Sequence, residues 1–232
     1  MQVDLNCDLG EGCPNDNEIM ALVTSVNIAC GFHAGDASTA RAALTEALRR
    51  GVQAGAHPGF PDRENFGRAQ MVRSEQQVFD DCVYQIGALA GLARGVGTKL
   101  RHVKPHGALY HLACADDAHA RPIIEAARLF GLYLVGLPGS RLQALSAGQC
   151  PFVAEGFVDR RYLPDGTLVP RSRPTAFIDD PAEAVDQVTW LLRERGVRTI
   201  CVHGDNPHAL EFIREVRSAL ASAGWRFAPF NP

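Results

Sequence analysis

The sequence lacks the short motifs that mark the commonest nucleotide-binding and zinc-binding sites. No GxxxxGK[ST] loop, no GxGxxG after a strand, no HExxH helix and no CxxC pair occurs in its 232 residues. A P-loop, a dinucleotide-binding loop, a helical zinc-protease site and a zinc knuckle are therefore excluded. Any ATP that the protein uses must be bound by another geometry.

The sequence also has no excess of basic charge and no long apolar run. Lysine and arginine number 23 against 26 aspartates and glutamates, a net charge of −3. This excludes electrostatic binding to nucleic acid or to an anionic membrane. No run approaches the roughly 18 apolar residues of a membrane span. The start, MQVDLNCDLGEG, lacks the pattern of a signal peptide, and the seven cysteines indicate free thiols, so we expect a cytoplasmic protein.

Short apolar runs alternate with helical stretches along the chain, whose length suits one large domain spanning 1–232. The predicted strands are Val3–Cys7, Val26–Ala29, Val52–Ala56, Leu100–Lys104, Leu132–Leu137, Pro151–Ala154 and Thr199–Val202. The predicted helices are Asp16–Val23, Ser38–Arg50, Ser74–Arg94, Asp117–Phe130, Ser140–Ala147, Asp180–Arg195 and Asn206–Ala223. This alternation predicts an α/β fold of parallel βαβ units, either a closed or nearly closed barrel or a doubly wound open sheet.

Capping residues support several of these helix boundaries. Ser74 and Gln77 fit a capping box, and Asp180, followed by proline, fits an N-cap. Asp36 suits a helix cap and a catalytic role equally well. The segment 155–179 has no clear pattern, and a loop of that length is typical of functional or mobile segments.

Polar and titratable side chains follow almost every predicted strand. In chain order they are Asn6, Asp8, Glu11, His33, Asp36, His57, Asp62, Lys104, His106, Glu155, Asp159, Arg160, His203 and Asp205. The carboxyl ends of parallel strands meet at the edge that carries the active site in α/β folds. Four histidines at corresponding strand ends therefore predict one shared site. Asp8, His33 and His57 would offer oxygen and nitrogen ligands to a divalent metal ion.

Six longer motifs occur in order: DLNCDLGE, NIACGFHAGD, GAHPGFPD, VKPHGALY, TLVPR and CVHGDNP. Together they closely resemble the LamB/YcsF family over nearly the whole chain. The resemblance implies an irregular seven-stranded β/α barrel related to glycoside hydrolases and polysaccharide deacetylases. It also implies the A subunit of a bacterial ATP-dependent 5-oxoprolinase, which opens the lactam of 5-oxo-L-proline to L-glutamate, with ATP as co-substrate and the B and C subunits as partners.

Two segments depart from the family pattern. The stretch after DLGE is the compact GCPNDNE, and RERGVRTICVHGD runs into its strand without an excursion. Both lie outside the strand-end motifs. We therefore expect differences in partner contacts or loop closure rather than in the reaction.

The implied reaction assigns roles to these residues. Those assigned to catalysis are Asp8, Glu11, His33, His57, Lys104 and His106. Those assigned to binding substrate or phosphate are Asn6, Arg160, Arg171, His203 and Asp205. Lysine and arginine would stabilise phosphate charge, carboxylates would act as base or metal ligand, and histidines would bind metal or transfer protons. Two other hypotheses stay open: a stand-alone metal-dependent amide hydrolase or deacetylase that uses no ATP, and a non-catalytic subunit that holds substrate.

Overall fold

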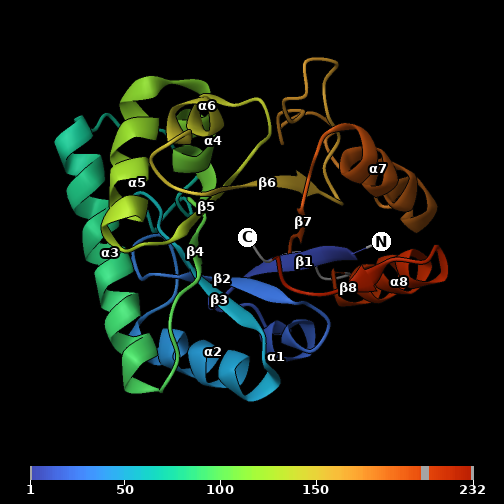
Figure 1. The fold of residues 1–232 in the computed structure, drawn as a ribbon, viewed down its shortest axis with the longest axis horizontal. Helices are drawn as coiled ribbons and strands as arrows, with labels where there is room; N and C mark the ends of the chain where they lie inside the picture. The colour runs from blue at the N-terminus through green and yellow to red at the C-terminus, as the bar shows by residue number, and fades with distance from the viewer. Residues whose placement is uncertain (1, 205–208, 231–232) are drawn as a thin grey trace.

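The computed structural model describes residues 2–204 and 209–230. In this part of the chain, seven parallel strands close into a barrel surrounded by helices (Figure 1). The strands are β1 (Gln2–Leu9), β2 (Ser25–Ala29), β3 (Gln53–His57), β4 (His102–Val103), β5 (Tyr133–Gly136), β6 (Phe152–Phe157) and β7 (Thr199–Val202). A short further strand, β8 (Arg226–Phe227), pairs with the first residues of β1.

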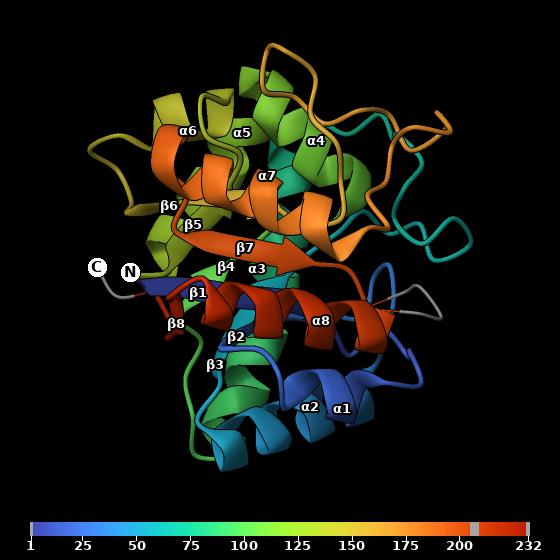
Figure 2. The same ribbon diagram turned by 90° about the vertical axis from the view of Figure 1, so that its right-hand side faces the viewer.

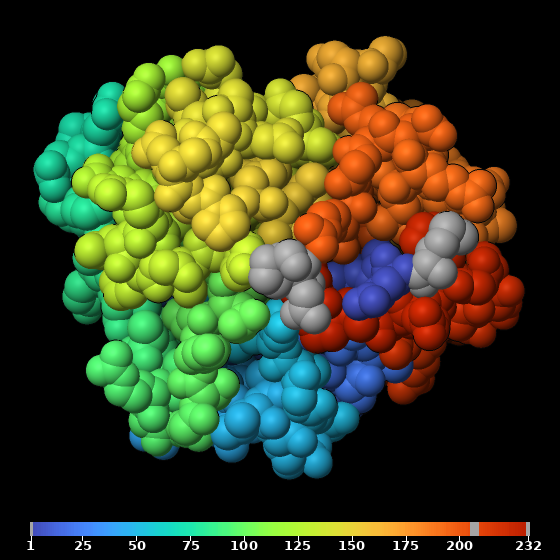
Figure 3. Space-filling model, viewed as in Figure 1, coloured from blue at the N-terminus to red at the C-terminus, as the bar shows by residue number. Residues whose placement is uncertain are grey.

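Strand β1 closes the barrel because it pairs on both of its edges. Its second half pairs with β2, from Asn6 with Ser25 onward, and its middle pairs with β7, from Asp4 with Thr199 onward. In Figure 3 the N-terminal residues, in blue, are accordingly enclosed by red and orange residues from the C-terminal part of the chain. The closure confirms the predicted seven-stranded barrel and excludes the doubly wound open sheet.

Helices cover the outside of the barrel. They are α1 (Asp16–Met20), α2 (Ala37–Arg50), α3 (Glu75–Gly95), α4 (Gly107–Ala115), α5 (Asp117–Leu129), α6 (Arg141–Ser146), α7 (Pro181–Glu194) and α8 (Ala209–Ser222). Figure 2 shows α7 and α8 lying across β7 and β1, with the long loops after β3 and β6 projecting at the end toward which β7 points. Because the strands are parallel, these loops surround the edge formed by the carboxyl ends of all seven strands.

Several boundaries differ from the prediction. The strand predicted over residues 100–104 contains only two paired residues, whereas β6 extends to Phe157, so that Glu155 lies within a strand and not after it. Helix α4 is absent from the prediction. Its N-cap residue, His106, makes no side-chain capping bond, so the sequence carries no cap signal there. The predicted start of the last helix at Asn206 lies outside the described residues.

The predicted caps at Ser74 and Asp180 are confirmed, because each side chain accepts a hydrogen bond from a backbone N–H of the following turn. Asp36 is also a helix cap. Its carboxylate accepts bonds of 2.8 Å from the backbone N–H groups of Ser38 and Thr39, and Thr39 completes a capping box.

Replacing Asp36 with alanine is expected to lower the free energy of unfolding, because α2 loses its N-cap. Activity of the folded variant should stay unchanged, since the side chain already bonds the helix end. Chemical denaturation and an activity assay on the same preparation check both expectations. A variant with normal stability and lost turnover would instead place Asp36 in the chemistry.

The side chains of β1 alternate between an apolar and a polar environment. Val3, Leu5 and Leu9 lie in the core between strands and helices. Asp4 and Asn6, on the other face, hydrogen-bond to side chains of β2, β6 and β7 across the barrel. Because neighbouring side chains of a strand point to opposite faces, the barrel interior is polar and its outer layer is apolar. The polar interior of the barrel is continuous with the edge formed by the carboxyl ends of the strands.

Candidate functional site

A cavity of about 450 Å³ opens at the carboxyl ends of the strands. Its volume lies in the range of small-molecule sites, roughly 300–1,000 Å³. Its polar and charged lining residues are Asp8, Glu11, His57, Arg68, Gln70, Lys104, His106, Tyr110, His111, Arg160, Arg171 and His203. The apolar lining includes Phe157, Leu168 and Pro170. One cavity therefore brings together half of the fourteen residues that the strand-end pattern predicts.

Three histidines and a glutamate form one cluster at this edge. Glu11 Oε1 lies 3.2 Å from His33 Nε2, 3.5 Å from His106 Nδ1 and 3.8 Å from His57 Nε2. His106 Nδ1 lies 2.9 Å from His57 Nε2. One ligand atom from each of these four residues lies within 4.8 Å of the others. Carboxylate and imidazole donors in this arrangement fit a divalent cation.

The histidines of the cluster differ in how readily they take up a proton. Burial and the nearby His57 lower the pKa of His33 to about 3. Burial, with His57 and His33, also lowers the pKa of His106. Burial acts in the same direction on His57, but the Asp8 carboxylate outweighs it and raises the pKa of His57. A proton taken up by the cluster therefore goes to His57.

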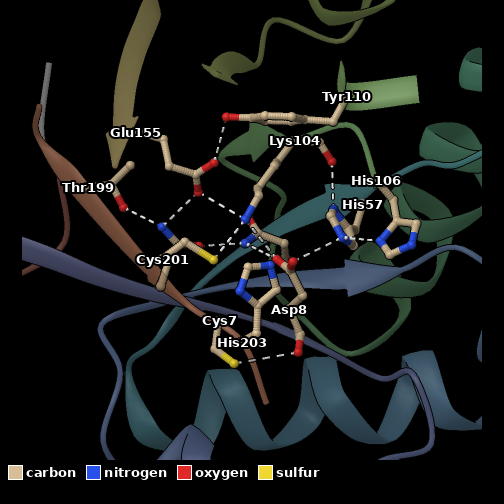
Figure 4. A network of polar contacts seen from close by, with 12 residues as sticks. Cys7, Asp8, His57, Lys104, His106, Tyr110, Glu155, Thr199, Cys201 and His203 are labelled. Atoms are coloured by element: carbon tan, nitrogen blue, oxygen red, sulfur yellow. Dashed lines mark hydrogen bonds and ion pairs between the residues drawn. The ribbon is translucent and has the colours of Figure 1, made fainter. Parts of the chain in front are cut away.

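Lys104 lies at the centre of a buried ion-pair network (Figure 4). Its Nζ is 3.0 Å from Asp8 Oδ1, 2.9 Å from Glu155 Oε1 and 3.1 Å from Cys201 Sγ. Burial would lower the pKa of Lys104, but Asp8, the Cys201 sulfur and Glu155 hold it well above its ordinary value. Burial likewise opposes ionisation of Asp8, yet His57 and Lys104 keep the pKa of its carboxyl well below the usual range. The ammonium and the Asp8 carboxylate are both charged.

The polar interior of the barrel supports this network from below. Asn6 Nδ2 donates to Glu155 Oε1 and to Thr199 Oγ1, at 3.2 and 2.7 Å. Asn27 Nδ2 donates to Asp8 Oδ1 at 2.7 Å and to Asn6 Oδ1 at 2.8 Å. These bonds fix the two carboxylates that hold Lys104. Two further residues complete the support: Tyr110 donates to Glu155 Oε2 at 3.1 Å, and His102 Nε2 lies 2.7 Å from Asn27 Oδ1.

His203 is held by Asp159 at another side of the cavity. Its Nδ1 lies 2.9 and 3.0 Å from the two oxygens of Asp159, and its ring stacks on Phe157. Burial alone would raise the pKa of Asp159, but attraction to His203 and hydrogen bonds from it lower that pKa. A carboxylate only accepts hydrogen bonds, so Nδ1 carries the proton. His203 Nε2 is therefore the nitrogen that is left to exchange a proton.

Three arginines, Arg68, Arg160 and Arg171, contribute to the wall of the same cavity. Arg160 is only 2% exposed; its Nη2 donates to the Val169 carbonyl at 2.7 Å, and its Nε has no hydrogen-bond partner in the described part of the chain. Burial and the neighbouring Arg171 lower the pKa of Arg160 to about 10. Burial and the nearby arginines 160 and 171 lower the pKa of His111 to about 4, which keeps this ring neutral. The guanidinium groups of these arginines make this wall of the cavity suited to binding an anion.

Two of the predicted site residues lie off the cavity surface, and a third cannot be placed. Asn6 lies beneath the cavity, where it supports Glu155. His33 is fully buried behind Glu11 and is not a lining residue. Asp205 lies outside the described residues. The metal set predicted as Asp8, His33 and His57 differs from the four-residue cluster, which contains Glu11 and His106 and not Asp8.

Other residues of the site are missing from the prediction. Tyr110 lies on the unpredicted helix α4, and Arg68 lies in the loop after β3, where no pattern marks it. Asn27 and His102 are polar residues inside strands that were predicted only from their apolar neighbours. The position of Tyr110 at the end of the VKPHGALY motif is the one signal that points to it.

Among residues 2–204 and 209–230, no helix combines the length and the apolar character that a bilayer crossing requires.

Comparison with known proteins identifies the family. The LamB/YcsF family model matches residues 3–232. The 5-oxoprolinase A subunit of Tolumonas auensis is 48% identical over 243 aligned positions, which cover 96% of this chain and 97% of that protein.

Solved structures are similar as well. The lactam utilization protein of Thermus thermophilus has a TM-score of 0.91 at 41% identity, covering 99% of this chain and all of that one. The peptidoglycan N-acetylglucosamine deacetylase domain of Eubacterium rectale shares the fold alone, with a TM-score of 0.56 at 13% identity over 99% of this chain and 88% of that one. The family match, the Tolumonas and Thermus relatives and the barrel agree: this chain belongs to the LamB/YcsF family.

Proposed function

We propose that this chain is the A subunit of a cytoplasmic, ATP-dependent 5-oxoprolinase, which opens the lactam ring of 5-oxo-L-proline to give L-glutamate. The names of the Tolumonas and Thermus relatives support a role in 5-oxoproline metabolism. The observation that carries the proposal is the cavity, which joins an arginine wall to a floor of carboxylates, histidines and one lysine. A small cyclic amide that carries a carboxylate matches both parts.

The chemistry requires activation of a stable amide. Transfer of the γ-phosphoryl group of ATP to the lactam oxygen releases ADP and leaves a phosphorylated ring. Water then attacks the ring carbon, the carbon–nitrogen bond breaks, and the nitrogen takes up a proton. A second water hydrolyses the resulting acyl phosphate to glutamate and phosphate. These steps need cations for phosphate charge, a base for water and an acid for nitrogen.

The residues around the cavity suit these needs. Lys104, charged and fixed between Asp8 and Glu155, stabilises negative charge on the lactam oxygen. Arg160 and its neighbouring arginines bind the carboxylate and phosphate oxygens. Asp8 accepts a hydrogen bond from the attacking water and orients it, while His203 Nε2, oriented by Asp159, takes up the proton of that water and passes it to the ring nitrogen. A divalent cation held by the histidine–glutamate cluster would polarise the carbonyl as a Lewis acid.

The direct test is to incubate the protein with 5-oxoproline and ATP, with and without the B and C subunits, and to follow glutamate and ADP. We expect both products from the complete set, in equal amounts. Failure of the complete set to form glutamate would exclude the proposal.

A second function is favoured by the histidine–glutamate cluster alone: metal-dependent hydrolysis of an amide without ATP. Turnover of a lactam or an N-acetyl substrate in the absence of ATP, abolished by a chelator, would support this alternative. A His33→Ala and His57→Ala double variant that keeps full activity in the complete assembly would instead identify the chain as a non-catalytic subunit.

A further inference from the structure

Two backbone carbonyls determine where the ring protons of the histidine cluster lie. His57 Nδ1 is 2.7 Å from the carbonyl oxygen of Lys104, and His106 Nε2 is 2.8 Å from that of Phe66. A carbonyl oxygen only accepts hydrogen bonds, so both of these nitrogens carry protons. The opposite nitrogens, His57 Nε2 and His106 Nδ1, then face each other at 2.9 Å with their lone pairs. Only a shared proton or a cation makes this contact favourable.

The spacing of the donor atoms favours a cation. In a tetrahedral site with metal–nitrogen and metal–oxygen bonds of about 2.0–2.1 Å, neighbouring ligand atoms are about 3.3 Å apart. The three distances among His57 Nε2, His106 Nδ1 and Glu11 Oε1 are 2.9, 3.5 and 3.8 Å. The rings of His57 and His106 are nearly perpendicular, at 88°, so that both lone pairs can point to one centre. Hydrogen bonds to backbone carbonyls commonly orient metal-ligating histidines in this way.

His33 has a different relation to this centre. Its ring stacks on His106, with centroids 3.8 Å apart and an interplanar angle of 2°. One ion cannot lie in the planes of two parallel stacked rings, so His33 and His106 are poor joint ligands. His33 Nε2 instead lies 3.2 Å from Glu11 Oε1, where it can donate to the carboxylate and orient it.

The burial of Glu11 and the access route agree with a cation. The Glu11 side chain is only 5% exposed and lies 3.2 to 3.8 Å from nitrogens of the three histidines. Buried carboxylates are stable when paired or bound to metal. Glu11, His57 and His106 all line the cavity, whereas His33 does not. An ion held by these three residues would therefore keep an open position toward the substrate.

We propose that Glu11, His57 and His106 bind one divalent ion of the Zn²⁺ or Co²⁺ type, and that His33 positions Glu11 without binding the ion. Two imidazoles and one carboxylate form a donor set that suits such ions. This ligand set replaces His33 and Asp8 of the sequence prediction by His106 and Glu11. It does not depend on the proposed lactam chemistry.

The experiment measures binding in the absence of ATP and 5-oxoproline. Protein purified without chelator is stripped of metal and titrated with Zn²⁺ by calorimetry and with Co²⁺ by visible absorption, which reports coordination directly. Wild type should bind one equivalent of each ion. Loss of an outer hydrogen bond weakens metal binding about 10- to 100-fold. Loss of a ligand should weaken Zn²⁺ binding by more than this and should change the Co²⁺ spectrum. We expect both effects in the variants Glu11→Gln, His57→Gln and His106→Gln.

His33→Gln is the discriminating variant. It should keep the wild-type Co²⁺ spectrum and lose at most about 100-fold in affinity. The matched control is His119→Gln. His119 lies on α5 and pairs with the N-cap residue Asp116, so this variant should bind Zn²⁺ and Co²⁺ as wild type does. Thermal unfolding of each stripped variant verifies that it is folded.

Two results would overturn the proposal. Absence of saturable binding by wild type would show that the cluster shares a proton and not a metal ion. A changed Co²⁺ spectrum in His33→Gln together with an unchanged one in His106→Gln would exclude the ligand assignment. Neither result depends on glutamate formation, so failure of this inference and failure of the proposed function are distinguishable.

Discussion

Replacing Lys104 with methionine is expected to abolish glutamate formation and to lower the free energy of unfolding by about 3–5 kcal/mol, the typical cost of breaking a buried ion pair. Lys104 is 2% exposed and its ammonium is the shared partner of Asp8 and Glu155. Without it, two carboxylates repel each other in the barrel. Turnover should fall at least about 100-fold, as for loss of one charge-stabilising donor. Urea denaturation and the coupled glutamate assay measure the two effects.

A double variant separates the structural effect from the chemical one. Lys104→Met combined with Glu155→Gln removes one charge of each sign, so we expect it to recover part of the lost stability while remaining inactive. Asn6 Nδ2 can still donate to an amide oxygen in the place of Glu155 Oε1, and the Tyr110 hydroxyl, which contacts Oε2, can accept from the new amide NH2 group. Normal stability of Lys104→Met alone would contradict the assignment of Lys104 as the charge that holds this network together.

Replacing Arg160 with methionine is expected to change binding and stability in opposite directions. Affinity for 5-oxoproline should fall about 10- to 100-fold, the value of a charge-assisted hydrogen bond. The melting temperature without ligand should equal or exceed that of wild type. The variant removes a buried guanidinium that is bonded to a neutral carbonyl and lies near Arg171 and Arg68. Calorimetric titration and thermal unfolding of one preparation measure both quantities.

The neighbouring residue supplies a matched control. Arg161 pairs with Glu183 and is 38% exposed, so Arg161→Met should leave binding unchanged. The uncharged lactam 2-pyrrolidinone lacks the carboxylate, and its binding should not respond to Arg160→Met. A destabilised Arg160→Met protein that binds 5-oxoproline normally would show that Arg160 has a structural role only.

The sequence predicts the barrel and the location of the site because both depend on a repeated local pattern. Each apolar run followed by a turn with a polar residue predicts a parallel strand whose end reaches one edge. His57, Lys104, His106 and His203 are found at that edge for this reason. The prediction does not need the distances between strands, since parallel topology alone brings their ends together.

The rest of the site depends on contacts between distant segments, which no local pattern records. Arg68 reaches the cavity from a long loop, and its neighbour Arg160 comes from another loop far along the chain. Asn27 and His102 lie within strands that are recognisable only by apolar neighbours, so nothing indicates that they point into a polar barrel. The separation of His33 from the metal ligands rests on ring stacking, a purely three-dimensional relation.

The closure of the barrel by β1 determines when the site can exist during synthesis. The first strand pairs with β7, and Asn6 bonds to Thr199, 193 positions later in the chain. The polar face of β1 therefore has no partners on one side until most of the polypeptide has left the ribosome. Such non-local pairing is slow and exposes unpaired strand edges in the meantime. The emerging chain is thus most vulnerable to aggregation along the edge of β1 that later pairs with β7, on the strand that supplies Asn6 and Asp8 to the finished centre.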